Sequence, residues 1–179
     1  LYTWGLAAAA PAECDRGPFP GCGVFFTEAD YLGLTLYPVR IDPLGLIFAT
    51  VFCLAIFGGL LYALSRRSQL ELSAAMVYAG GAVGAVLAGD VLTLFVYAEV
   101  MAVASTLVVW AGGPQARRAG MRYIVIHLLA GVLLMAGAAG HIFSTGETAF
   151  VPMEAATPAA WVMLLAFLIN GGAPPRSAW

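Results

Sequence analysis

Glu99 is the residue whose chemistry conflicts most with its surroundings. It is the ninth residue of the apolar segment 91–111, about 12 Å from the start of a helix that rises 1.5 Å per residue. A carboxylate at that depth in a membrane is costly and by default marks a proton or ion path. We therefore expect Glu99 to bind and release protons. The alternative is a neutral Glu99 that is hydrogen-bonded to a neighbouring helix.

Two histidines lie in the next apolar segment, 121–143, and their spacing of fourteen residues places them on nearly the same helix face. His127 stands well inside the segment, where an imidazole can relay protons near neutral pH. The alternative is a His127 side chain hydrogen-bonded to a backbone carbonyl. We expect His141 to lie at the outer membrane interface. Two histidines are too few for the four axial ligands of a diheme cytochrome, so we expect no heme.

Asn170 and Asp90 stand at the ends of apolar segments. Asn170 precedes Gly171-Gly-Ala-Pro-Pro175, which either breaks a membrane helix to line an ion path or ends a helix at the cytoplasmic headgroups. Asp90 directly precedes the segment that holds Glu99, where it either caps the helix or takes up protons at the outer surface. Together with Glu99 and His127, these two residues form the predicted proton pathway.

The sequence lacks the patterns of other kinds of site. It contains no glycine-rich phosphate loop, no CxxC motif and no cluster spaced like metal ligands. No nucleophile stands near a base in the sequence. We therefore expect no metal, no cofactor and no active site belonging to this chain alone.

The composition indicates which elements position these residues. Of the 179 residues, 61% are hydrophobic and 10% are charged, whereas a soluble domain has about 25% charged residues. This excludes a soluble domain and a nucleic-acid-binding protein, and it predicts an all-α polytopic membrane protein in a lipid bilayer. The predicted spans are 44–64, 72–89, 91–111, 121–143 and 159–172. Because the chain starts at Leu1 and stops at Trp179 just after an apolar segment, we expect a fragment truncated at its C-terminus.

The arginines predict the orientation. Six of the eight lie in alternate loops, namely Arg66, Arg67, Arg117, Arg118, Arg122 and Arg176. By the positive-inside rule these loops are cytoplasmic, in a protein of the inner (plasma) membrane. Residues 11–43 then form a periplasmic loop. Within it, Leu34–Ile41 alternates like a short β-strand, and Pro38 disfavours a central strand. Cys14 and Cys22 share the loop, either as a disulfide or as two free thiols.

Two further segments carry structural predictions. Residues 1–10 are apolar but too short to span a bilayer, and no basic residues precede them. We therefore expect the end of a truncated helix there rather than the remnant of a signal peptide. Gly80, Gly81 and Gly84 fall on one face of the second span, which predicts close helix packing.

Four stretches together resemble the antiporter-like membrane subunits shared by complex I, membrane-bound hydrogenases and Mrp-type cation/proton antiporters. They are residues 42–45 (Asp-Pro-Leu-Gly), 90–102 around Glu99, 116–131 with His127 and Gly131, and 167–179 with Asn170. The resemblance implies a bundle of about fourteen helices built from inverted repeats. This chain would hold part of that antiporter-like bundle, about helices 3 to 7.

In this family a glutamate of the fifth helix pairs with a lysine of the seventh and couples proton movement along a buried polar axis. The resemblance places Glu99 at the glutamate position and Asn170 at the lysine position. The chain contains no lysine, so the charge pair cannot operate in that form. Either another base such as His127 partners Glu99, or the cycle differs.

The resemblance predicts a proton-translocating D-type subunit of a multi-subunit Mrp-type antiporter. Such a subunit works with other membrane subunits and exchanges protons for Na⁺ or K⁺. Two alternatives stay open. One is a proton-pumping subunit of NADH:quinone oxidoreductase (complex I) or of a related hydrogenase complex. The other is a non-transporting membrane scaffold in which Glu99 is merely a buried polar packing residue.

Overall fold

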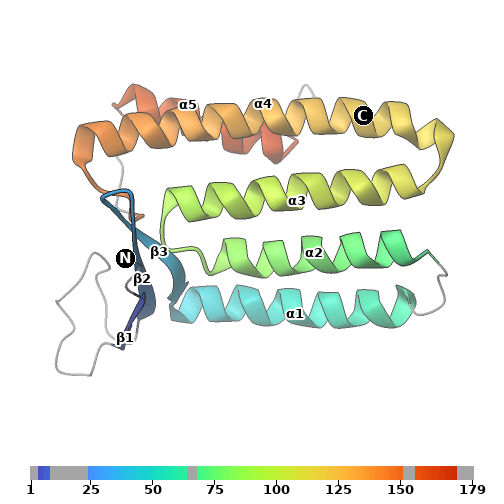
Figure 1. Cartoon of the computed structure of the whole chain (residues 1–179), viewed down its shortest axis with the longest axis horizontal. Coiled ribbons are helices and arrows are strands. Elements are labelled where there is room, and N and C mark those ends of the chain that lie inside the picture. The colour runs from blue at the N-terminus through green and yellow to red at the C-terminus, as the bar shows by residue number, and fades with distance from the viewer. Residues whose placement is uncertain (1–3, 9–23, 64–67, 151–155, 173–179) are drawn as a thin grey trace.

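Five helices lie along one another, with a small sheet at one end (Figure 1). This computed structural model describes residues 4–8, 24–63, 68–150 and 156–172, with the backbone alone for 4–8. The helices are α1 (Pro43–Ala63), α2 (Gln69–Val86), α3 (Val91–Ala111), α4 (Pro114–Thr145) and α5 (Pro158–Asn170). Among the described residues, α1, α3 and α4 are long and apolar enough to cross a membrane. The predicted all-α membrane fold is thereby confirmed.

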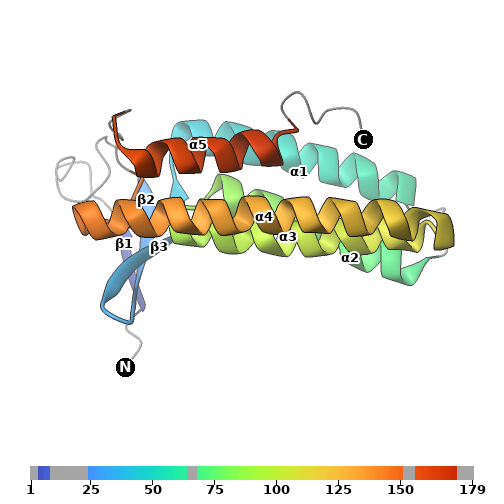
Figure 2. The same ribbon diagram turned by 90° about the horizontal axis from the view of Figure 1, so that it is seen from above.

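The helix α3 is central, because it packs against α2 on one side and α4 on the other. Figure 2 shows α1 and α5 on the same side of the layer that α2, α3 and α4 form. The helix α5 packs along α4, and α1 contacts α2. Any residue on the α4 side of α3 therefore faces the middle of the bundle.

The predicted glycine face of the second span is confirmed at two of its three positions. A Cβ atom at Gly81 would lie 2.8 Å from Cγ of Met101, and one at Gly84 would overlap the ring of Tyr97. Both partners belong to α3, so these glycines let the two helices approach closely. Gly80 has open space around its Cα instead and does not contribute to this interface.

The sheet is antiparallel, in the order β1 (Trp4–Ala8), β2 (Phe25–Tyr31) and β3 (Leu34–Ile41). The strand expected at 34–41 is confirmed, and it is an edge strand, where Pro38 is tolerated. The expectation of a helix end in residues 1–10 is wrong for Trp4–Ala8, which pair with β2. A short apolar run has no periodicity that separates strand from helix, and here the free edge of β2 decides.

The fourth span begins earlier than predicted, at Pro114 rather than Met121. Proline fits the first turn of a helix, where its missing N–H costs nothing. Arg117 and Arg118 therefore lie in the first turns of α4 and not in a loop. With 32 residues, α4 is about 48 Å long, so its ends extend beyond a hydrocarbon core of about 30 Å. Residues 9–23, which include Cys14 and Cys22, lie outside the described residues.

Asp42 holds the start of α1. Its Oδ1 accepts a hydrogen bond of 2.6 Å from the backbone N–H of Gly45, and its Oδ2 accepts one of 3.1 Å from Nε of Arg40. The Gly45 bond first, and the Arg40 guanidinium second, hold the pKa of the Asp42 carboxyl below its usual value, against an opposing effect of burial. Asp42 thus caps α1 in its ionised form and joins it to the end of β3.

Replacing Asp42 by Ala should lower the free energy of unfolding by about 1 kcal/mol, the usual value of such a cap. The folded-state pKa is depressed, so the stabilisation is present above the unfolded value of about 3.9 and is lost as pH falls through the folded value. Thermal unfolding of the purified protein in detergent, at neutral pH and near pH 3, measures this. Equal stability of wild type and Asp42→Ala at neutral pH would contradict the capping role.

Candidate proton path between α3, α4 and α5

Glu99 points from α3 toward α4. A Cβ atom at Gly131 would overlap Oε1 of Glu99 and would lie 2.8 Å from its Cδ. The carboxyl group therefore occupies the space that the missing side chain of Gly131 leaves on α4. Glu99 itself is half-buried.

His127 lies one helical turn before Gly131 on the same face of α4. Residues four apart on a helix have their Cβ positions about 5–6 Å apart, so the imidazole is the next ionisable group along α4 from the Glu99 carboxyl. The ring of Tyr123 lies one further turn away, with its centroid 4.3 Å from that of His127. A hydrogen bond of 2.9 Å joins the Tyr123 phenol to the hydroxyl of Ser105 on α3. Polar groups thus follow the seam between α3 and α4 for several turns.

Asn170 brings the end of α5 to this seam. Its side chain lies beside the His127 imidazole, and its buried Oδ1 atom has no hydrogen-bond partner among the residues that the structure describes. Both side chains line a cavity of about 450 Å³ together with Arg122, Tyr123 and Gly171. α5 ends at Asn170, two residues before the predicted end of this span at residue 172, and residues 173–179 lie outside the described part.

Asp90 occupies the other end of α3 and is completely buried, with 0% of its surface exposed. Its carboxylate caps the helix by accepting 2.7 Å and 2.6 Å hydrogen bonds from the N–H and O–H of Thr93. It also accepts a 2.7 Å bond from the N–H of Tyr37 in β3. The expected capping role is confirmed, and the same carboxylate joins the sheet to the bundle.

His141 was expected at the outer membrane interface, but the structure places it inside the bundle. It is buried, with 6% of its surface exposed, and within the described residues its Nε2 atom has no hydrogen-bond partner. An interfacial position would leave the ring in water. The turn of α4 that carries it instead continues the buried face that includes Leu134 and Ala138, because α3 and α5 cover this end of α4.

Of the four predicted pathway residues, the structure brings His127 and Asn170 to one cavity and places Glu99 against Gly131, one turn of α4 from His127. Asp90 lies about two and a half turns of α3 away from Glu99, at the sheet end. Sequence reasoning missed Tyr123 and Ser105, and it did not give Gly131 a role. The spacing of four residues between Tyr123, His127 and Gly131 is the signal that places all three on one helix face.

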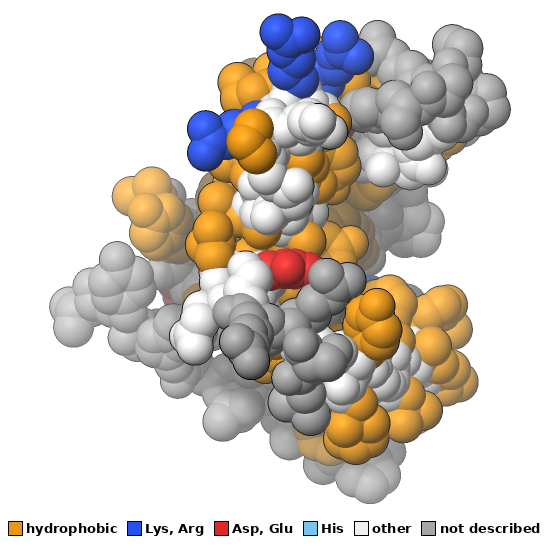
Figure 3. Space-filling model, turned by 90° about the vertical axis from the view of Figure 1, so that its right-hand side faces the viewer, with side chains coloured by type: hydrophobic (Ala, Val, Ile, Leu, Met, Phe, Trp, Pro, Cys, Tyr) orange, Lys and Arg blue, Asp and Glu red, His pale blue; other side chains and the backbone are white. Residues whose placement is uncertain are grey.

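Arginines mark the end of the bundle onto which this seam opens. Figure 3 looks at the end where α4 begins, and the basic side chains gather there over hydrophobic neighbours. The exposed arginines of α4 are Arg117, Arg118 and Arg122. Arg66, Arg67 and Arg176, which share the predicted cytoplasmic side, fall outside the described residues.

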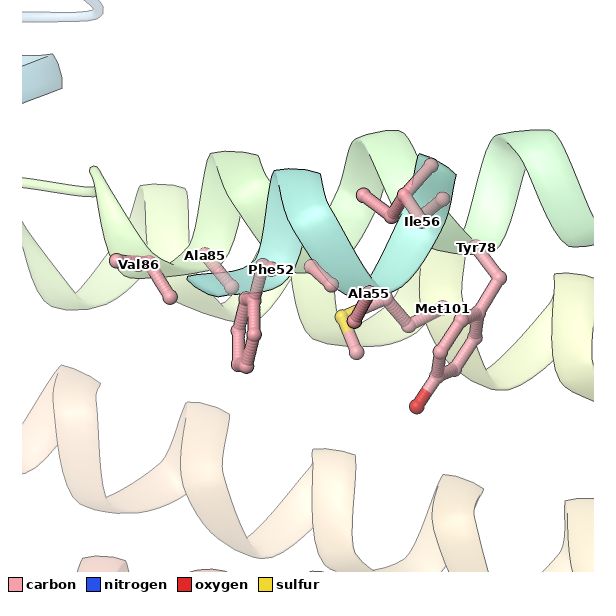
Figure 4. A pocket seen from close by; sticks show the side chains of 9 residues that line it. Phe52, Ala55, Ile56, Tyr78, Ala85, Val86 and Met101 are labelled. Atoms are coloured by element: carbon pink, nitrogen blue, oxygen red, sulfur yellow. The ribbon is translucent and has the colours of Figure 1, made fainter. Parts of the chain in front are cut away.

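A second cavity, of about 500 Å³, lies between α1, α2 and α3. Its lining is apolar apart from the hydroxyl of Tyr78, as the close view shows for Phe52, Ile56 and Met101 (Figure 4). Such a lining supplies no proton acceptor beyond one phenol. In the part of the chain that the structure describes, no three His, Cys, Asp or Glu side chains gather as a metal site.

Two curated proteins are similar to the chain, although no protein-family model matches it. The D-type subunit of the Na(+)/H(+) antiporter of Alkalihalophilus pseudofirmus is 39% identical over 69 residues, which are 38% of this chain and 14% of that protein. The D-type subunit of the probable K(+)/H(+) antiporter of Rhizobium meliloti is 30% identical over 187 aligned positions, covering 94% of this chain and 34% of that protein. The chain thus spans about a third or less of the curated relatives it matches.

These similarities agree with the membrane-spanning helices described above. Both curated proteins are named as antiporter subunits, and both the helices and the relatives support a location in a membrane. Over part of their length, the chain is therefore similar to the D subunits of two cation/proton antiporters.

Proposed function

We propose that this chain is part of a proton-translocating membrane subunit of a multi-subunit monovalent cation/proton antiporter of the Mrp type. The observation that carries the proposal is the position of Glu99, whose carboxyl group lies between α3 and α4, one turn of α4 from His127. An intramembrane carboxylate beside an imidazole is a typical proton relay. The names of the two curated relatives support the choice of an antiporter.

In this proposal a proton moves between the arginine-rich end and Glu99. The cavity beside Arg122 leads to the His127 imidazole, which exchanges the proton with the Glu99 carboxylate. Asn170 carries no charge, and its amide supplies a polar group beside the imidazole in the same cavity. The hydroxyls of Ser105 and Tyr123 hold the Tyr123 ring against that imidazole.

In this proposal, His127 takes over the role of the seventh-helix lysine in the family that the sequence resembles. The chain has no lysine, and Asn170 stands at that position. An imidazole can alternate between neutral and cationic forms near neutral pH, so His127 can form and break an ion pair with Glu99 as a lysine would. Asp90 is given a capping role here, because three donors already occupy its carboxylate.

The proposal also specifies the orientation in the membrane and the partner subunits. The arginine-rich end faces the cytoplasm of a plasma membrane, following the positive-inside rule. Other membrane subunits complete the complex, which exchanges the protons for Na⁺ or K⁺. A redox-driven pump related to complex I is the second candidate, and the antiporter names of both relatives favour the first.

The test uses everted membrane vesicles from antiporter-deficient cells that express the complete complex. A pH gradient is imposed by dilution, and its decay is followed with a fluorescent amine after addition of NaCl, KCl or choline chloride. We expect Na⁺ or K⁺ to dissipate the gradient without NADH, while choline has no effect. Proton movement that requires NADH oxidation would support the redox-driven pump, and no movement under either condition would support a scaffold.

A further inference from the structure

We propose that Gly131 is a positioning residue for Glu99. By lacking a side chain, it forms a notch on α4 that holds the Glu99 carboxyl on the His127 side of α3. This inference rests on the proposed proton path, and the experiments below separate its failure from the failure of that path. Gly131 would act through Glu99, without itself carrying a proton.

The notch fits the carboxyl group closely. A Cβ atom at Gly131 would overlap Oε1 of Glu99, and it would lie 2.8 Å from Cδ and 3.5 Å from Oε2. Real Cβ atoms essentially never lie within 3.0 Å of another heavy atom, as this one would from Oε1 and Cδ. The Glu99 carboxyl in this position and a side chain at position 131 therefore exclude each other. Gly131 is itself buried in the interface between α3 and α4.

The notch also determines toward which neighbouring helix the Glu99 side chain points, α4 or α2. On its other flank Glu99 borders a groove of about 450 Å³ between α2 and α3, whose lining includes Leu70, Ala74, Val77 and Val103. That groove is almost entirely apolar and lies on the side of α3 away from α4. A carboxyl group displaced from the notch would move toward this groove and away from His127. The distance over which a proton passes between the Glu99 carboxyl and the His127 imidazole would then increase.

The consequence of filling the notch is functional rather than structural. At Gly131 the atoms that must yield belong to the flexible end of the Glu99 side chain. At Gly137, by contrast, a Cβ atom would lie 3.0 Å from the backbone N of Met163 and 3.1 Å from the backbone O of Ala159, so α5 itself would have to move. Because alanine favours a helix over glycine, Gly131→Ala should fold and assemble, whereas Gly137→Ala should lower stability.

The first experiment compares Gly131→Ala with Gly80→Ala in the vesicle assay, with flux divided by the amount of assembled complex. We expect Gly131→Ala to lower cation-driven proton flux by about tenfold or more, because displacing a reacting group by about 1 Å can have such an effect. Gly80→Ala, a helical glycine with open space around it, should leave the flux unchanged. Unchanged flux in Gly131→Ala would overturn the proposal.

The second experiment asks whether the carboxyl group has moved. The infrared C=O band of protonated Glu99 is identified as the band that Glu99→Gln removes. Its frequency should change in Gly131→Ala and not in Gly80→Ala, because only the first changes the surroundings of the carboxyl. An unchanged band in Gly131→Ala would show that Gly131 does not position Glu99, even if the flux falls.

The third experiment is a rescue. Aspartate is shorter than glutamate by one methylene, about 1.5 Å, so Glu99→Asp withdraws the carboxyl from the notch and leaves room for a methyl group. We expect the double variant Glu99→Asp/Gly131→Ala to transport faster than Gly131→Ala alone. If the defects of the two single variants simply multiply, the proposal is wrong. If Glu99→Gln transports normally, it is the proton path that fails, whatever Gly131 does.

Discussion

Glu99→Gln should lower cation-driven proton flux by about 100-fold or more, the range found when a positioned proton-transfer group is removed. Glutamine has nearly the shape of glutamate and fits the same notch at Gly131, but it cannot release a proton. The complex should therefore assemble in normal amounts. The vesicle assay, with flux divided by the amount of complex in the membrane, measures the effect.

A matched control is available on the neighbouring helix. Glu71 lies in the first turn of α2, where its backbone N–H donates to the Ser68 cap, and it is not among the residues of the proposed path. Glu71→Gln makes the same chemical change and should leave the flux unchanged. If Glu99→Gln behaves like this control, Glu99 is a polar packing residue and the scaffold alternative gains support.

Asp90→Ala should lower the free energy of unfolding by about 3 kcal/mol or more. It removes a helix cap, which is usually about 1 kcal/mol, and it leaves buried donors without acceptors, at about 1–3 kcal/mol each. The donors are the N–H groups of Tyr37 and Thr93 and the hydroxyl of Thr93. Because Tyr37 belongs to β3, the variant should also loosen the sheet from the bundle. Denaturant unfolding in detergent measures the loss.

Asp90→Asn gives a second, graded variant. It keeps one oxygen acceptor but turns an NH₂ group toward a donor, so its stability should lie between those of wild type and Asp90→Ala. If capping is the role of Asp90, the flux per assembled complex should stay near that of wild type. A large fall in flux at wild-type stability would instead assign Asp90 to proton uptake at the outer surface, the other role that its position allowed.

The sequence determined the membrane class, the approximate helices and the unusual carboxylate, for reasons of solvation. Long apolar runs require lipid, so α1, α3 and α4 could be expected from composition and length. A glutamate inside such a run is costly wherever its side chain points, so Glu99 could be identified without a structure. The strand Leu34–Ile41 could likewise be expected from its alternation. Capping by Asp90, one of the two roles expected for it, follows from the preference of helix starts for short polar side chains.

The tertiary structure alone decided what these residues touch. Periodicity places a residue on a face of its own helix but does not say which helix covers that face, and α3 has α2 on one side and α4 on the other. The contact of Glu99 with Gly131, the approach of Asn170 to His127 and the burial of His141 all depend on that choice. The strand at Trp4–Ala8 was decided by the free edge of β2, a non-local partner that a run of apolar residues cannot reveal.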